Sequence, residues 1–220
     1  MAVLKENVEE VIHLDGNDEG PIRIMLCLRI DDETVVRNLD NFKRIHRKLL
    51  DPYGLKFCEG ETGFQHVVLG RIFLKNSVEY EQCRDALLSI PMTELDRWEL
   101  DARRVRVKGV SMMGRGFLCA NIERGGRFLT DLQLHFEQQL ISQNISTFVG
   151  NYMQRPHIKL LSYSAESETL HEEIGLKLQS GNRLKDFGQQ RVDAIQVLKV
   201  SDSPCKCQRA YFDLFTVPLS

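Results

Sequence analysis

The chain has 220 residues, of which 42% are hydrophobic and 27% are charged, and its formal net charge at pH 7 is −2. This composition is that of a globular protein with one sizeable domain or two small lobes, and its charge gives no general attraction to nucleic acid. No apolar run approaches the ~20 residues of a membrane helix, and the acidic N-terminus does not resemble a signal peptide, so we expect an intracellular protein of the cytoplasm, the nucleus or both.

The first half of the chain predicts an N-terminal arm, a strand, a helix and a second strand. Residues 1–20 are polar and acidic, and we expect a loose arm before one bilobal domain over 21–220. Ile22–Ile30 is almost continuously hydrophobic, which predicts a strand buried on both faces. Apolar residues then recur at helical spacing over Val35–Leu49. The next strand, about Phe64–Leu74, carries a histidine near its start.

The rest of the chain predicts a similar alternation of strands and helices. The expected elements are a helix capped by Ser77 and ending near Ile90, strands at Leu100–Met113 and Phe117–Ile122 with a hairpin turn between them, a helix around Phe128–Leu140, a strand at His157–Ser164, a helix at Ser167–Leu178, and closing strands at Arg191–Val200 and Ala210–Val217. This order, mostly antiparallel, belongs to the α+β class.

Two of these strands, one in each half of the chain, begin with a histidine in a similar setting. They are Phe64-Gln65-His66-Val67-Val68-Leu69 and Arg155-Pro156-His157-Ile158-Lys159-Leu160-Leu161. Residues two apart on a strand share a face, so His66 lies with Val68 and His157 with Lys159. A fold that pairs the two imidazoles can cleave a phosphodiester by general acid–base catalysis without a metal. Either histidine alone is better explained as a hydrogen-bonded structural residue, and only the matched setting of the two brings catalysis to equal weight.

These residues resemble the 2H phosphoesterases, in particular the central, nuclear-localisation-signal-type domain of A-kinase anchoring protein seven and its relatives. The matched landmarks are Ile24–Leu28, the His66 strand, the strand pair within Val105–Ile122, the segment Arg155–Leu161 and the last strand ending in Pro218. The resemblance implies two α+β lobes related by a pseudo-twofold axis, each an antiparallel sheet with flanking helices. It also implies that His66 and His157 line the cleft between the lobes as acid and base, in an order that the sequence leaves open.

The chain departs from the family motif, in which a threonine or serine follows each histidine by two residues. Val68 and Lys159 occupy these positions. A valine gives the phosphate no hydrogen bond, a loss of about 1.5–3 kcal/mol, or one to two powers of ten in rate. Lys159 can contact a phosphate directly, with Arg155 and Arg71 as further candidates, but a cation also lowers the pKa of a neighbouring histidine.

Three functions are compatible with these observations. The first is the binding of a nucleotide or RNA end between the lobes, with phosphodiesterase activity on RNA or 2′,3′-cyclic phosphates that needs no cofactor, metal or membrane. The second is a catalytically inactive pseudoenzyme that binds a protein partner, which the missing hydroxyls and the basic helix face at Lys43–Lys48 favour. The third places the ligand on the basic strand of Arg104, Arg106 and Lys108. Cys205-Lys206-Cys207 lacks a second cysteine pair, so free thiols are expected rather than zinc.

Overall fold

The computed structural model describes residues 21–53, 57, 65–89, 103–113, 117–145, 148–150, 155–162, 168–202 and 209–219. The expected arm at 1–20, the hairpin turn at 114–116 and the cysteines at 205 and 207 lie outside these ranges. None of the helices within them is long and apolar enough to cross a membrane.

Four α-helices, one 3₁₀ helix and nine strands are defined within the described ranges. In chain order they are β1 (Ile22–Ile30), α1 (Glu33–Leu50), the 3₁₀ helix Asp51–Tyr53, β2 (Gln65–Leu74), α2 (Ser77–Leu88), β3 (Arg104–Met113), β4 (Phe117–Arg124), α3 (Gly126–Ser142), β5 (Phe148–Gly150), β6 (His157–Ser162), α4 (Glu168–Asn182), β7 (Asp186–Arg191), β8 (Ala194–Asp202) and β9 (Arg209–Pro218).

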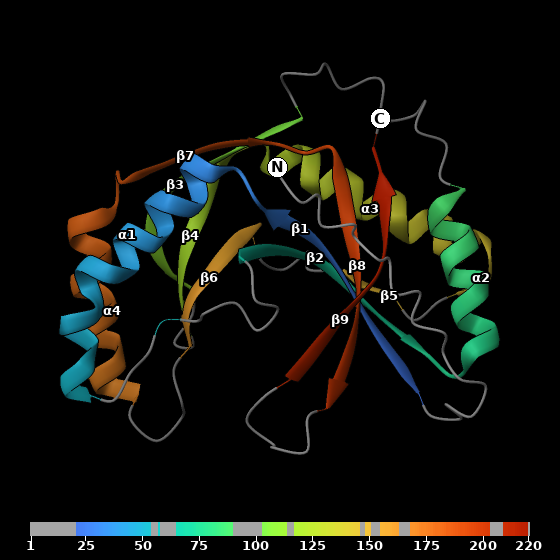
Figure 1. The fold of residues 1–220 in the computed structure, drawn as a ribbon, viewed down its shortest axis with the longest axis horizontal. Coiled ribbons are helices and arrows are strands. Elements are labelled where there is room, and N and C mark those ends of the chain that lie inside the picture. Colours follow the sequence, from blue (N-terminus) through green and yellow to red (C-terminus); the bar gives the residue numbers. More distant parts are fainter. Residues whose placement is uncertain are drawn as a thin grey trace, which may run out of the picture.

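The strands form one antiparallel sheet in the order β7-β3-β4-β6-β2-β1-β8-β9, with β5 also beside β2 (Figure 1). The sheet has two halves that meet where β6 lies against β2, and the residue pair described at this seam is Val67 with Ile158. The expectation of an antiparallel α+β fold is thus confirmed. The two lobes are halves of one sheet rather than two separate sheets.

The described helices cover one face of this sheet. In Figure 1, α1 and α4 lie side by side at one end of the molecule and α2 lies at the other. α1 packs on β7, α4 on β3, and α3 on β2 and β5. The strand residues that face these helices are buried, among them Leu69, Leu118 and Leu160. Residues of the other parity, including His66 and His157, lie on the opposite face, which we call the inner face.

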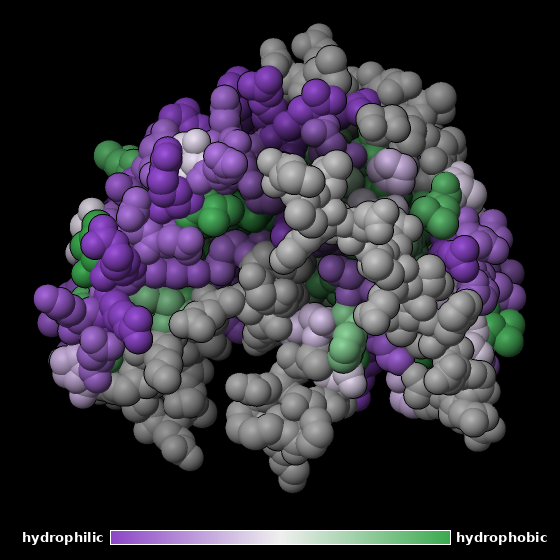
Figure 2. All heavy atoms as spheres, in the orientation of Figure 1, coloured by the Kyte–Doolittle hydropathy of each residue, from purple (hydrophilic) through white to green (hydrophobic). Residues whose placement is uncertain are grey.

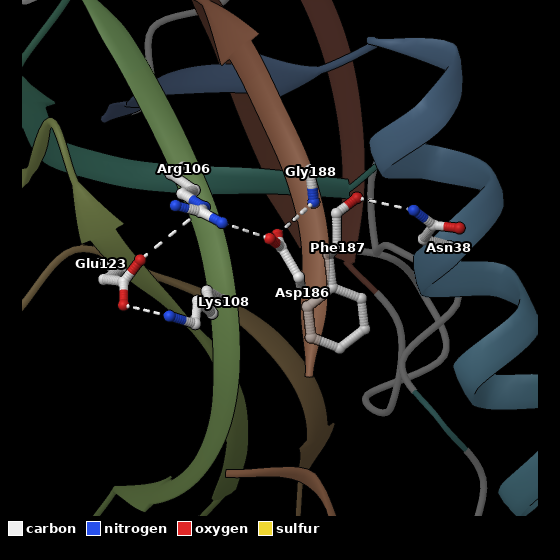
Figure 3. Close-up of polar contacts among 7 residues, drawn as sticks. All are labelled: Asn38, Arg106, Lys108, Glu123, Asp186, Phe187 and Gly188. Atoms are coloured by element: carbon white, nitrogen blue, oxygen red, sulfur yellow. Dashed lines mark hydrogen bonds and ion pairs between the residues drawn. The ribbon is translucent and has the colours of Figure 1, made fainter. Parts of the chain in front are cut away.

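Strands β5 and β7 were not expected from the sequence. β7 contains a single large apolar residue, Phe187, which is fully buried and packs edge-on against Phe42 of α1 with ring centroids 5.7 Å apart. The Asn38 side-chain amide of α1 donates to the Phe187 carbonyl oxygen over 3.0 Å (Figure 3). β7 therefore forms because tertiary packing and pairing with β3 compensate for a polar sequence.

Helix ends also differ in detail from the expectations. α2 is capped by Asn76 rather than by Ser77, because the Asn76 side chain accepts a hydrogen bond from the Glu79 backbone N–H over 3.0 Å. α4 continues to Asn182 and thus passes through the expected break at Gly181. α4 packs on β3 and β4, and within this last turn the Asn182 side-chain amide donates to the Leu178 carbonyl oxygen over 2.8 Å.

The start of α3 requires a glycine. Gly125 precedes the helix with a φ of 83°, a left-handed conformation that residues with a Cβ adopt at a cost. A Cβ at Gly125 would overlap the carbonyl oxygen of Arg104, whereas a Cβ at Gly126 would meet nothing within 4 Å. Of the two adjacent glycines, therefore, only Gly125 is required by the backbone conformation and by the space around it.

A single side chain ties the corner between β1 and α1 to β7. The Gln190 side-chain oxygen accepts hydrogen bonds from the backbone N–H groups of Asp31 (2.9 Å) and Asp32 (3.1 Å). Its amide nitrogen donates to the Arg29 carbonyl oxygen over 2.6 Å. This Gln190 clasp uses the amide oxygen twice and one of the two amide N–H groups, and it joins segments from opposite ends of the chain.

Candidate active site

The two histidine strands are neighbours, and their register brings both motifs together. Val67 of β2 lies opposite Ile158 of β6, and both are buried. One residue further along this antiparallel ladder in each direction, His66 falls opposite Lys159 and Val68 opposite His157. All four side chains therefore share the inner face. The histidines are diagonal neighbours, a relation in which Cβ atoms lie about 7 Å apart, so a phosphate fits between the imidazoles.

His157 is arranged as a proton acceptor. Its Nδ1 lies 2.8 Å from the carbonyl oxygen of Arg155. Because a carbonyl only accepts hydrogen bonds, Nδ1 of the neutral ring carries the hydrogen and Nε2 keeps the lone pair. Burial lowers the pKa of His157, the bond to Arg155 opposes this, and the charge of Lys159 lowers the pKa further. The ring is therefore neutral near pH 7, with Nε2 ready to take a proton.

An aromatic ring of β4 contacts both β6 side chains. The Phe117 ring stacks on the imidazole of His157, with centroids 5.8 Å apart and planes 20° apart. The Lys159 ammonium lies 5.8 Å from the centroid of the same ring, within the range of a cation–π contact. Among the described residues, no carboxylate pairs with Lys159.

The valine at the first hydroxyl position belongs to an apolar cluster. Val68 packs against Met25, Cys27 and Leu198, which are all buried on the inner face of β1 and β8. Burial raises the pKa of Cys27 to about 12, aided by the Asp213 carboxylate. The thiol is therefore an inert part of this cluster, and Val68 suits its apolar surroundings.

The two arginines that were expected to contact the phosphate, Arg71 and Arg155, do not lie beside the histidines in the way that Lys159 does. Arg71 is exposed on the inner face, but it follows His66 by five residues, about 16 Å along a strand. Arg155 is also exposed, and its carbonyl oxygen rather than its charge is what contacts His157. The structure instead places Arg29 of β1 directly opposite His66.

Sequence reasoning missed Arg29 because β1 was expected to be buried on both faces. The structure shows burial on both faces at the centre of the strand and exposure of Arg23 and Arg29 near its ends. Arg23 and Arg29 are an even number of residues apart, so they share one face of the strand. This spacing is the sequence signal that could have identified Arg29. The pairing of Arg29 with His66 depends on the register of β1 against β2.

The basic strand proposed as a ligand surface is largely neutralised within the sheet. Figure 3 shows Arg106 of β3 between Asp186 of β7 and Glu123 of β4, with ion pairs to both. Lys108 pairs with Glu123 over 2.8 Å. The hydrogen bond to Asp186 raises the pKa of Arg106 and lowers the pKa of Asp186. Because their charges are paired, Arg106 and Lys108 make a weak anion surface.

Comparison with solved structures defines the fold. Escherichia coli LigT complexed with 3′-AMP has a TM-score of 0.60 and 12% identity over 91% of this chain and 99% of LigT. LigT complexed with ATP has a TM-score of 0.58 and 13% identity over the same shares. Usb1 from Kluyveromyces marxianus has a TM-score of 0.51 and 15% identity over 91% of this chain and 98% of Usb1.

No family model matches the sequence, and no curated protein matches it significantly. The structural matches show that this chain has the fold of LigT and Usb1. At these identities they show the fold alone, and the chemistry of this chain has to be argued from its own residues.

Proposed function

We propose that this protein binds a nucleotide or an RNA end on the inner face, with the phosphate between His66 and His157, and cleaves phosphodiesters slowly. The observation that carries the proposal is the register of β2 and β6, which puts both imidazoles diagonally on one face. LigT structures with 3′-AMP and ATP support it, because they show that nucleotides bind to a protein of this fold.

The geometry suggests how the work is divided. For a 2′,3′-cyclic phosphate, His157 Nε2 takes a proton from the attacking water, and His66 gives a proton to the departing ribose oxygen. Lys159 and Arg29 flank His66 in register and neutralise the phosphate charge. Val68, opposite His157, contributes no hydrogen bond, and the missing contact is worth about 1.5–3 kcal/mol. We therefore expect the phosphate to bind mainly through Lys159 and Arg29, and the rate to be low.

The test is hydrolysis of 2′,3′-cyclic CMP and of a short oligoribonucleotide in the presence of a chelator. We expect His66→Ala and His157→Ala each to lower the rate by about 10²-fold or more, the usual contribution of a general acid or base. His46→Ala is the matched control, because His46 lies on α1 and contacts Asn182 of α4, away from the inner face. An inactive wild-type protein, or activity that survives His157→Ala, would contradict the catalytic role.

A second candidate is an inactive relative that serves as a protein-interaction module. The observation that favours it is the replacement of the hydroxyl opposite His157 by Val68, which packs with apolar neighbours. The surface in Figure 2 is mainly hydrophilic over α1, where Arg44, Arg47 and Lys48 are exposed. Calorimetric titration with AMP, CMP and short RNA separates the two candidates, because a pure interaction module shows no saturable binding.

The finer parts of the proposal rest on the sequence. The specific resemblance to the central domain of A-kinase anchoring protein seven rests on the landmarks in β1, β2 and β6. We further propose that residues 21–220 act as one bilobal unit in the cytoplasm or the nucleus, where RNA ends arise. Limited proteolysis that splits this unit into two stable fragments would contradict the single domain.

A further inference from the structure

A pocket of about 220 Å³ opens next to the proposed phosphate site, where β1 and β7 end and β8 begins. Its polar lining includes Arg29, Asp31, Gln190, Asp193, Gln196 and Thr216. The volume corresponds to about seven water molecules at their share of the liquid volume. It is smaller than a usual drug-sized site and suits a single nucleobase rather than a whole nucleotide.

The register of three strands connects this pocket to the histidines. Arg29 on the pocket wall lies opposite His66, and Gln196 lies opposite Cys27, which in turn lies opposite Val68. Neighbouring strands are about 4.8 Å apart, so the pocket lies one to two strands, roughly 5–10 Å, from His66. A nucleotide whose phosphate sits at His66 can therefore extend its nucleoside across Arg29 into the pocket.

The pocket wall carries both donors and acceptors of hydrogen bonds. Its charged donors are Arg29, which lies opposite His66, and Arg191, which is ion-paired with Asp193. Three acceptors matter for the base. The Gln196 side-chain oxygen is buried and has no hydrogen-bond partner among the described residues. Asp31 contributes a carboxylate for which the described ranges show no partner, and Asp193 keeps one carboxylate oxygen beyond its ion pair with Arg191. The Gln190 oxygen and one of its two amide N–H groups are engaged in the clasp to backbone groups. A ligand that donates hydrogen bonds therefore satisfies the acceptors to which the described residues assign no partner.

Nucleobases differ in this respect. Cytosine and adenine carry exocyclic amino groups, and acidic side chains are the usual partners of the cytosine amino group. Uracil presents a carbonyl oxygen at the same position, and this oxygen would face the carboxylates unfavourably. We infer that the pocket holds the base of the bound nucleotide and selects an amino-bearing base, cytosine or adenine, over uracil. The inference rests on the proposed function, because it assigns the base of the ligand whose phosphate lies at the histidines.

The experiment compares calorimetric titrations of CMP and UMP into the full chain. We expect CMP to bind about tenfold more tightly, the discrimination of one good base contact. Gln196→Met removes the buried acceptor, and Asp31→Asn offers a donor to uracil as well, so both variants should lose most of the preference. Asp51→Asn is the matched control, because it makes the same change after the last residue of the 18-residue α1, roughly 27 Å along the helix from its start.

Cytidine and uridine, which lack the phosphate, separate this inference from the proposed function. Chemical shift changes at millimolar nucleoside should show the same preference for cytidine, and Lys159→Thr should weaken CMP binding without changing the ratio of CMP to UMP affinity. Equal binding of cytidine and uridine, or a preference that persists in both pocket variants, overturns the inference and leaves the phosphate site standing. If CMP does not bind but cytidine still binds in preference to uridine, the proposed phosphate site is wrong and the base pocket stands.

Discussion

Replacing Val68 with threonine should increase phosphodiesterase activity. The two side chains have nearly the same shape, so the change replaces one methyl group opposite His157 with a hydroxyl. Val68 is half-buried on the inner face beside Met25, Cys27 and Leu198. The hydroxyl therefore stands where the phosphate is expected, next to the histidine proposed as the base.

The size of the effect follows from two opposing contributions. A hydrogen bond from the hydroxyl to a charged phosphate is worth about 1.5–3 kcal/mol, which raises kcat/KM by roughly 10- to 100-fold if it is made in the transition state. The cost is the loss of apolar contact, and the half-buried hydroxyl can still reach water. We expect this cost to be about 1 kcal/mol in the free energy of unfolding, visible as a slightly lower Tm.

The assay is hydrolysis of 2′,3′-cyclic CMP, with kcat/KM and Tm measured for each variant. Val200→Thr is the matched control, because Val200 packs on the same apolar cluster without lying opposite His157. It should reproduce the change in Tm without the gain in rate. If Val68→Thr folds normally and kcat/KM does not rise, or if both threonines raise it equally, the missing hydroxyl is not what limits the rate.

The remaining predictions concern proton transfer, the start of α3 and the basic strand. Burial and Lys159 lower the pKa of His157, so the protein should stay active somewhat below pH 6.5, and Lys159→Thr should move the acidic limb of the kcat/KM profile upward in pH. The lowered pKa also means that the unfolded chain binds more protons, so the Tm should fall as the pH drops below 6.5. Gly125→Ala should cost more than about 2 kcal/mol in urea unfolding, from strain and overlap with β3, whereas Gly126→Ala should change stability by less than about 1 kcal/mol. Lys108→Glu should leave CMP and RNA affinity unchanged, and a lost salt-dependent affinity would show that the basic strand contacts the ligand after all.

Local sequence patterns predicted most of the elements correctly. The apolar run of β1, the helical spacing in α1 and α3, and the alternation in β2 and β6 are each properties of contiguous residues. They gave the order of elements and the α+β class. They also placed His66 and His157 on strands with the correct neighbours at the same parity.

Features that depend on pairing between distant segments of the chain could not be predicted from local sequence patterns. β7 has only Phe187 to mark it as a strand, and its partner β3 lies about 80 residues earlier, as the Arg106–Asp186 pair shows. The register of β1 on β2, which puts Arg29 beside His66, includes an irregularity between Leu26 and Cys27. A sequence pattern specifies the face of a side chain, but not its neighbour on the next strand.

The Gln190 clasp has a consequence for how the protein is made. Its hydrogen bonds join residues 158 to 161 positions apart, so β1 and α1 leave the ribosome long before the side chain that secures them. Until β8 is synthesised, one edge of β1 is unpaired and Met25 lacks its cover from Leu198. Such contacts slow folding and favour a chaperone during synthesis. A chain cut short before β7 would therefore lose strands from both halves of the sheet, and no intact lobe would remain.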